Sequence, residues 1–275
     1  MKLRILPGIF LLSILLSCTK QQVYLDETND SSLAKIIVNK ELIVGVDPSL
    51  PPLSFYSDTG RIIGYDVDIA QTIADRLGVN LRLVAVTAED RIQILENRGI
   101  DYIASGFINN EQNAKRFLLS APYLRDALVV VVLRDAKGET PFKEFSDLRN
   151  KRIGIVSDQE VMEIAAHSPL FINNIRKPYL FPRLEKLLIA LDYGQLEAGV
   201  MNLLAFYSKI TKEKKPYDAV GEPLTIATYS YAFRKEDGEL HDAVDLLLRD
   251  MAEQGTLRTI SDKWFGADVS IIGKY

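Results

Sequence analysis

The segment "YDVDIAQTIADRLG" (65–78) has the apolar spacing of an amphipathic helix. Its aliphatic side chains recur every four residues and share one helix face: Ile69, Ile73 and Leu77. Two acids, Asp66 and Asp68, stand near its start. Gly78 is a typical helix stop, because glycine readily adopts a left-handed conformation. The segment is therefore predicted to be one helix with one buried face.

Short β-rich segments lie on both sides of this helix. "LIVGVD" (42–47) precedes it and "VNLRLVAV" (79–86) follows it, and both are predicted to be strands. "TAEDRIQILENRG" (87–99) is predicted to be a second helix, between a Thr-x-x-Asp cap and a terminal glycine. "IDYIASGF" (100–107) is a third strand, and "NNEQNAKRF" (109–117) begins a further helix, whose first N–H groups favour anions. This β-α-β-α-β order predicts an open α/β sheet.

A second α/β series follows the long apolar strand "ALVVVVLR" (127–134). Its strand and helix patterns cover 145–150, 151–156, 159–167, 183–194, 196–202 and 203–210. "EPLTIATYSYAFRK" (222–235) is then predicted to be a strand pair or one long strand. Two helical patterns, 239–255 and 256–266, finish the chain. Two α/β series joined by long strands indicate two lobes, with the terminal helices returning to the first.

The composition is that of an ordinary globular protein. The chain has 275 residues, of which 47% are hydrophobic and 25% charged, and its formal net charge is −4. A mildly acidic chain without a basic tract is a poor nucleic-acid binder. Its two histidines, His167 and His241, have no nucleophile or metal-ligand pattern around them. The sequence therefore predicts no enzyme activity, no cofactor and no metal site.

The N-terminus has the pattern of a secretory address. "MKLR" is cationic, and "ILPGIFLLSILLS" is apolar but too short for a comfortable membrane span, so residues 1–17 are predicted to be a signal peptide. Cys18, the single cysteine, resembles the lipobox cysteine of bacterial lipoproteins. In those proteins the signal peptide is cleaved directly before this cysteine, which becomes the N-terminus and carries fatty acids such as palmitate. Residues 18–32 would then be a lipid-anchored flexible tether. An incidental cysteine in a conventional signal peptide is the alternative.

Six segments carry a resemblance to a known family. They are "ELIVGVDPSLPPLSFYSDTGRIIGYDVDIAQTIADRLGV", "ILENRGIDYIASGF", "LLSAPYL", "FSDLRNKRIGIV", "ALDYGQLEAGVMN" and "GTLRTISDKWFG". In this order, across 36–266, they resemble the extracellular solute-binding proteins of the amino-acid-binding type, family 3 of the ABC-importer receptors. The resemblance implies a binding protein for a small polar solute, in the periplasmic space or on the bacterial cell surface. Its partners would be an ABC permease and ATPase, and the membrane through the N-terminal lipid.

The family implies a type II periplasmic-binding-protein fold. In this α/β fold each lobe is an open mixed sheet flanked by helices, and two crossing strands form a hinge. On this chain lobe 1 would be 33–130 plus 226–270, and lobe 2 would be 131–225. The hinge strands would cross near Val130–Leu133 and Thr225–Tyr229. A ligand that touches both lobes selects the closed state.

The family's first-lobe site transfers to this chain only in part. Its acid falls on Asp47, but its two ligand-stacking aromatics fall on Leu50 and Ala88. The strand-end segment that contacts ligand falls on Ser105, Gly106, Phe107 and Ile108. Ser105 and Gly106 fit the family pattern, whereas Ile108 replaces a usual hydroxyl. The resemblance therefore implies a site without its aromatic walls.

The family's two charged partners of an amino acid are both replaced. The arginine that clamps the ligand α-carboxylate falls on Asn113, and the aspartate that pairs with the α-ammonium falls on Asn202. Acids and amides occupy the second-lobe segment, Asp158, Gln159 and Glu160. Removing one partner of a buried charge pair typically costs about 3–5 kcal/mol. Tight binding of a standard free amino acid is therefore not expected.

Two interpretations remain open from the sequence. The retained and added acids favour a cationic or neutral polar ligand, but Asp47 also suits a strand-end turn and Asp158 a helix cap. The protein is expected to be a transport receptor. The alternative is a non-transport sensor or interaction lipoprotein of the same fold.

Overall fold

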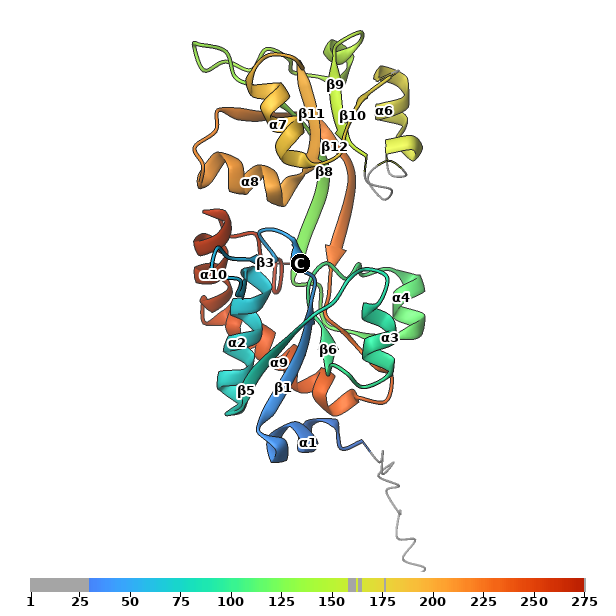
Figure 1. The fold of residues 1–275 in the computed structure, drawn as a ribbon, viewed down its shortest axis with the longest axis vertical. Coiled ribbons are helices and arrows are strands. Elements are labelled where there is room, and N and C mark those ends of the chain that lie inside the picture. Colours follow the sequence, from blue (N-terminus) through green and yellow to red (C-terminus); the bar gives the residue numbers. More distant parts are fainter. Residues whose placement is uncertain (1–29, 158–161, 163–164, 176, 275) are drawn as a thin grey trace, which may run out of the picture.

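Two α/β lobes, each built on a five-stranded sheet, are joined by the long strands β8 and β12 (Figure 1). The computed structural model describes residues 30–157, 162, 165–175 and 177–274. The predicted α/β class is confirmed by this arrangement of sheets with helices on their faces. Within the described residues, no helix combines the length and the apolar character that crossing a bilayer requires.

Lobe 1 contains a mixed sheet in the order β5-β1-β6-β13-β7. Its elements are α1 (Ser32–Asn39), β1 (Glu41–Val46), β2 (Ser49–Leu50), β3 (Ser54–Tyr56), β4 (Ile62–Ile63), α2 (Tyr65–Leu77), β5 (Asn80–Ala85), α3 (Arg91–Glu96), β6 (Tyr102–Ile103), α4 (Glu111–Arg116), β7 (Leu118–Leu119), β13 (Ala232–Phe233), α9 (Gly238–Glu253) and α10 (Thr256–Phe265). The strand β1 pairs in parallel with β5 and β6, while β13 is antiparallel to β6 and β7. The last two helices lie against α1 and α2 and so belong to this lobe.

The helix α2 forms as its sequence predicts. It ends at Gly78, whose φ of 70° is left-handed and whose N–H returns to the last turn. Ile69 and Ile73 are fully buried on its inner face. The predicted strand 100–107 pairs over Tyr102–Ile103 alone, after which the chain leaves the sheet and turns at Gly106. This turn brings the end of the segment to the gap between the lobes.

Lobe 2 has the sheet order β10-β9-β11-β8-β12. Its elements are β8 (Leu124–Leu133), the 3₁₀ helix η1 (Phe145–Leu148), β9 (Ile153–Val156), α6 (Pro169–Asn174), β10 (Tyr179–Phe181), α7 (Leu184–Asp192), β11 (Ala198–Asn202), α8 (Leu203–Thr211) and β12 (Tyr217–Tyr229). The helix predicted at 159–167 falls mostly outside the described residues. Buried side chains form one cluster on each face of this sheet.

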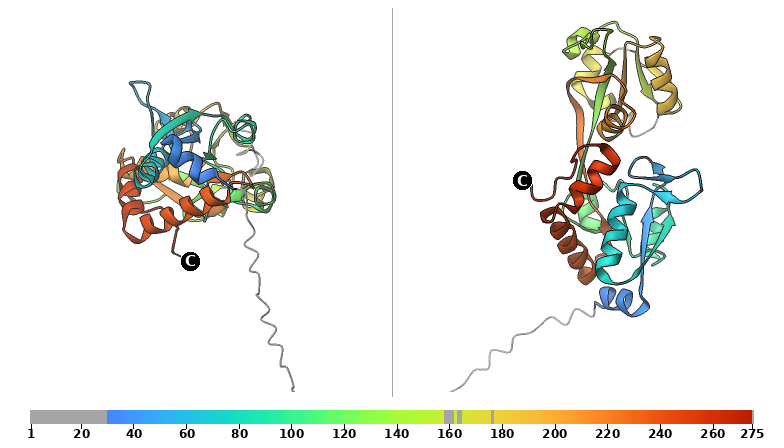
Figure 2. Two further views of the ribbon diagram at one scale, coloured as in Figure 1. Left: turned by 90° about the horizontal axis from the view of Figure 1, so that it is seen from below. Right: turned by 90° about the vertical axis from the view of Figure 1, so that its left-hand side faces the viewer.

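The hinge consists of β8 and β12, which pair antiparallel from Leu124 with Tyr229 to Leu133 with Tyr217. Val130 pairs with Val200 of β11 as well as with β12, so the expected crossing segment Val130–Leu133 lies within the second sheet. The strands leave lobe 1 at the Leu124 and Tyr229 ends. The C-terminal segment lies beside them, where the Ile271 N–H donates to the Tyr123 carbonyl (Figure 2).

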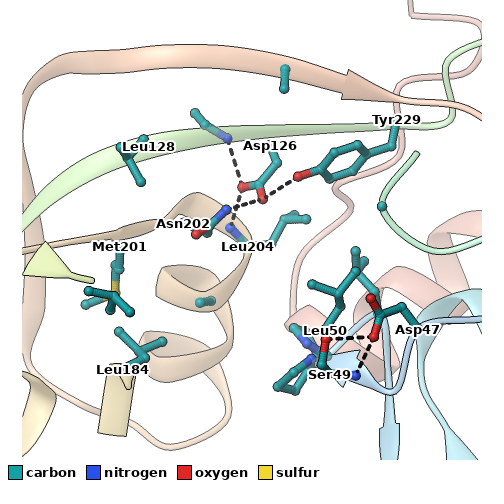
Figure 3. A pocket seen from close by; sticks show the side chains of 18 of the residues that line it. Asp47, Ser49, Leu50, Asp126, Leu128, Leu184, Met201, Asn202, Leu204 and Tyr229 are labelled. Atoms are coloured by element: carbon teal, nitrogen blue, oxygen red, sulfur yellow. Dashed lines mark hydrogen bonds between the residues drawn. The ribbon is translucent and has the colours of Figure 1, made fainter. Parts of the chain in front are cut away.

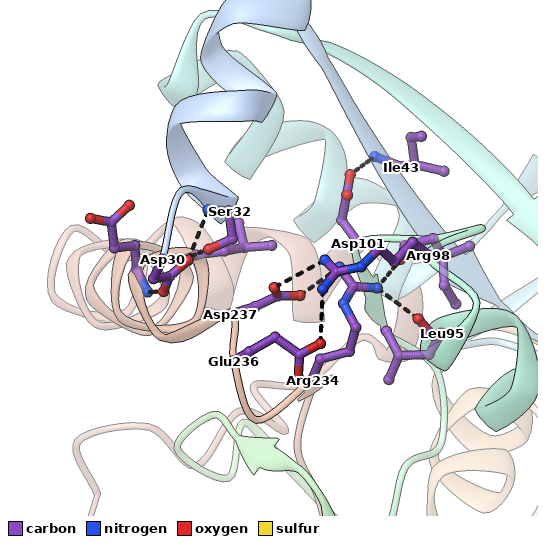
Figure 4. A network of polar contacts seen from close by, with 12 residues as sticks. Asp30, Ser32, Ile43, Leu95, Arg98, Asp101, Arg234, Glu236 and Asp237 are labelled. Atoms are coloured by element: carbon purple, nitrogen blue, oxygen red, sulfur yellow. Dashed lines mark hydrogen bonds and ion pairs between the residues drawn. The ribbon is translucent and has the colours of Figure 1, made fainter. Parts of the chain in front are cut away.

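A network of hydrogen bonds and ion pairs lies at the end of lobe 1 that is remote from lobe 2 (Figure 4). The buried Arg234 guanidinium donates to the carbonyls of Leu95 and Ile100 and pairs with Asp237 at 2.5 Å. Asp30, the first described residue, accepts the Glu239 N–H at 2.6 Å at the start of α9. The chain therefore enters lobe 1 at its outer end.

Candidate functional site

A cavity of about 500 Å³ lies between the lobes, and we call it the interlobe cavity (Figure 3). Its walls come from three places: the loops after β1 and β6 with the start of α3 in lobe 1, the hinge strands, and β11 with α7 and α8 in lobe 2. This volume is typical of small-molecule sites. Five predicted site residues line it: Asp47, Leu50, Ala88, Gly106 and Asn202.

The lobe 1 wall begins with the turn after β1. The Asp47 Oδ1 accepts hydrogen bonds from the Ser49 N–H at 2.9 Å and the Ser49 hydroxyl at 2.6 Å. Asp47 therefore serves as a turn former while it lines the interlobe cavity. Leu50 comes so close to Gly106 that a Cβ there would lie 2.7 Å from its Cδ1. Gly106 has a left-handed φ of 66°, so its backbone conformation and the nearby Leu50 side chain both favour glycine at this position.

The rest of the strand-end segment turns away from the interlobe cavity. The Ser105 hydroxyl lies 2.8 Å from that of Ser54 in the interior. Phe107 is buried edge-to-face on Phe117, and Ile108 bridges to Tyr229 through its backbone. Ser105, Phe107 and Ile108 are not among the residues that line the cavity.

Asn113 also lies outside the cavity lining. Its side chain donates to the Ile108 carbonyl at 2.7 Å, and its own N–H donates to the Asn110 Oδ1 at 2.8 Å. The amide thus ties the start of α4 to the preceding turn. Asn110 is the N-cap, as the helix start at 109–117 predicts.

Asn202 faces a carboxylate that the sequence analysis did not identify. Its Nδ2 donates to Asp126 Oδ2 at 2.9 Å, and the Tyr229 hydroxyl approaches the same oxygen at 3.3 Å (Figure 3). The N–H groups of Ala127 and Leu204 donate to Oδ1 at 2.8 and 3.2 Å. Asp126 is only 4% exposed. Burial raises the pKa of its carboxyl above the ordinary value, although the four hydrogen bonds oppose this.

Arg91 is a second charged residue that sequence reasoning missed. Its Nη1 donates to the Gly106 carbonyl at 3.4 Å, and its guanidinium lies 5.1 Å from the centre of the Phe107 ring. It follows the reciprocal cap of Thr87 and Asp90, where each backbone N–H bonds the other side chain. The sequence held one signal for each of these two residues. Arg91 directly follows a capping box, and Asp126 is an acid directly before the apolar strand 127–134.

Several predicted residues cannot be placed. Asp158, Gln159, Glu160 and Cys18 lie outside the described residues, so their roles stay predictions. In the described part of the chain, no group of three or more His, Cys, Asp or Glu residues is arranged to hold a metal ion.

Comparison with known proteins identifies the family. The model of the bacterial extracellular solute-binding proteins, family 3, matches residues 42–267. The L-cystine-binding protein TcyJ of Escherichia coli (strain K12) is 26% identical and is aligned over 88% of this chain and 89% of its own length. The structure of Tv2483 bound to L-arginine has 28% identity and a TM-score of 0.67, over 88% of this chain and 98% of the other. An ancestral cationic amino acid solute-binding protein has 25% identity and a TM-score of 0.75, over 86% and 100%.

The matched region includes both lobes and the whole interlobe cavity. The solved relatives confirm the predicted two-lobe, type II periplasmic-binding-protein fold. This family consists of receptors that bind small solutes rather than of enzymes. The chain belongs to the bacterial extracellular solute-binding proteins, family 3.

Proposed function

We propose that this protein is the lipid-anchored receptor of an ABC importer and that it closes on a small polar solute other than a standard free amino acid. The observation that carries the proposal is the interlobe cavity, which is lined by both lobes and by both hinge strands. A solute held there contacts both lobes, so its binding free energy favours the closed state.

The polar and charged residues of the cavity indicate the class of ligand. The positions of the family's carboxylate and ammonium partners carry Asn113 and Asn202, and the side chains of both are engaged with neighbouring protein groups. Two buried acids, Asp47 and Asp126, line the cavity. Two solved relatives are a protein bound to L-arginine and an ancestral cationic amino acid solute-binding protein. We infer a solute with a cationic or neutral polar group and no requirement for an α-carboxylate.

Decarboxylated solutes are expected to bind at least as tightly as the matching amino acids. Calorimetric titration would compare agmatine with L-arginine and putrescine with L-ornithine, while small-angle scattering monitors closure. Asn113, at the position of the family's α-carboxylate clamp, gives that group no charge pair, and burying the group carries a desolvation cost. Amino acids that bind more than tenfold tighter than their decarboxylated partners would contradict the ligand class. Binding without any closure would favour a non-transport sensor or interaction lipoprotein.

The anchoring proposal rests on Cys18 and on where the described chain begins. Asp30 is held at the outer end of lobe 1, so a tether from there would join the chain to the membrane at the end remote from lobe 2 (Figure 2). In bacterial cells the wild-type chain is expected in the membrane fraction and the Cys18→Ser variant in the soluble fraction. The matched control is Ser17→Ala, which should stay with the membrane. Equal partition of Cys18→Ser and wild type would contradict lipid anchoring.

A further inference from the structure

The carboxylate of Asp126 occupies a distinctive place in the interlobe cavity. It lies on β8 where this strand leaves lobe 1, so it belongs to the hinge rather than to one lobe. Figure 3 shows it beside Asn202 and Tyr229, across the cavity from Asp47 and Leu50. A ligand group held at this point can be reached by both lobes as they close.

The hydrogen bonds that hold Asp126 come from neutral groups. Two are backbone N–H groups, one is the Asn202 amide, and one is the Tyr229 phenol. These donors fix the orientation of the carboxylate but do not neutralise its charge. A buried carboxylate gains most from a cationic donor, because a charge-assisted hydrogen bond is about twice as strong as a neutral one.

The pairing of β11 with β8 explains why the acid stands on one strand and the amide on the other. Asn202 pairs with Leu128, so Asp126 is two residues along β8 and on the same side of the sheet. The family's ammonium partner falls at position 202, where this chain has an amide that donates to Asp126. This part of the cavity therefore has its carboxylate on β8 rather than on β11.

We propose that Asp126 is the specificity-determining carboxylate of the interlobe cavity and binds a cationic nitrogen of the solute, an ammonium or a guanidinium, with Asn202 and Tyr229 as positioning residues. This inference rests on the proposed function as a solute receptor. The Tyr229 hydroxyl makes the longest of the four hydrogen bonds, at 3.3 Å. A ligand N–H takes its place on Oδ2, and the hydroxyl then turns to another partner.

The test titrates the full chain with agmatine, which stays cationic from pH 5.5 to pH 8. Asp126→Asn is expected to weaken agmatine binding about 10- to 100-fold at pH 8, which is the range for a hydrogen bond to a charged group. In the wild type, affinity falls as pH is lowered and Asp126 is protonated. In Asp126→Asn that part of the pH dependence is lost. The other charged groups that line the cavity are the same in both chains: Asp47, Arg91, Arg183 and Glu185.

Two further variants separate recognition from folding. Tyr229→Phe removes the hydroxyl that the ligand displaces, so it should weaken agmatine binding less than Asp126→Asn does and should keep the pH profile. Asp101→Asn is the matched control, because Asp101 is a half-buried acid that also accepts a backbone N–H, from Ile43 at 2.7 Å, but at the outer end of lobe 1 (Figure 4). It should bind agmatine like the wild type. Thermal unfolding verifies that each variant is folded.

Two results would overturn the role of Asp126. In the first, Asp126→Asn binds agmatine with an affinity within twofold of the wild type, or with an affinity no lower than that of Tyr229→Phe. The other is closure of the wild type on neutral or anionic solutes while agmatine and putrescine give no heat, which leaves the receptor function standing. A wild-type chain that closes on no solute of any charge contradicts the proposed function itself.

Discussion

Replacing Asn202 by Asp is expected to destabilise lobe 2 and the hinge by about 2–3 kcal/mol at pH 8, because water screens part of the repulsion at this exposed position. The Asn202 amide nitrogen lies 2.9 Å from the Asp126 carboxylate. A carboxylate at this position removes a donor from a buried anion and places a second negative charge beside it. Two acids at this distance cannot both ionise without a large cost, so one takes up a proton. Urea unfolding at pH 8 and pH 5 measures the effect.

The sign of the pH dependence follows from the raised pKa of this new pair. A proton that is bound in the folded state, but not in the unfolded state at pH 8, makes stability fall as pH rises. The loss should therefore be smaller at pH 5. The matched neutral control is Asn202→Ala, which leaves out the repulsion and should lose only about 1 kcal/mol with less dependence on pH. Equal stability of Asn202→Asp and wild type at pH 8 would mean that the two side chains do not face each other.

The exchange variant, which combines Asp126→Asn with Asn202→Asp, is compared with Asn202→Asp alone. It restores one acid and one amide at the same 2.9 Å contact, so most of the lost stability should return. It also moves the carboxylate to the position at which the family pairs with an α-ammonium. Adding an arginine at position 113 would not by itself rebuild an amino-acid site, because Asn113 is turned to the Ile108 carbonyl. Recovery of amino-acid binding thus requires both the relocated carboxylate and a cation that reaches the cavity.

Local sequence patterns predicted what depends on local structure. The apolar spacing of 65–78 and the stop at Gly78 gave α2, and the family alignment brought Leu50, Ala88 and Gly106 to one wall. Asp126 was missed because an acid inside an apolar strand has no visible partner in sequence. Its partner is set by the pairing of β8 with β11, some 76 positions along the chain.

The position of Ser105, Phe107 and Ile108 outside the cavity lining has a related cause. Ser105 fits the family pattern, yet its hydroxyl turns inward to Ser54. The chain leaves the sheet after Ile103, and the left-handed turn at Gly106 decides which side chains face the cavity. Such orientation depends on tertiary contacts with Leu50 and Phe117, which residue types alone do not specify.

Asp66 is another residue whose surroundings the sequence does not reveal. Its place near the start of α2 suggests an exposed acid at a helix terminus, but the structure buries it completely. No described group makes a well-formed hydrogen bond to either carboxyl oxygen. Burial raises the pKa of Asp66 to about 7, and the nearby Tyr123 and Ser105 hydroxyls only partly oppose this. The carboxyl is therefore largely protonated in mildly acidic solution.

Asp66→Asn is expected to stabilise the protein, by a gain that grows as pH rises from 3.8 to about 7 and is therefore larger at pH 8 than at pH 5.5. The folded-state pKa of about 7 lies above the unfolded value of 3.8, so the wild type loses stability as pH rises through this window. The full shift corresponds to roughly 4 kcal/mol at most, because one pKa unit is worth about 1.4 kcal/mol.

Urea unfolding of both chains from pH 5 to pH 8 gives the difference in free energy of unfolding. The other acids with raised pKa values, Asp101, Asp126 and Asp237, are common to both chains and cancel in that difference. Asp75→Asn, on the same helix but bonded to Gln71 at the surface, should run parallel to the wild type at every pH. If Asp66→Asn also runs parallel to it, Asp66 keeps an ordinary pKa and is ionised in the core. In that case Tyr123 and Ser105 must stabilise the anion directly, and replacing them should then lower stability at pH 8 more than at pH 5.5.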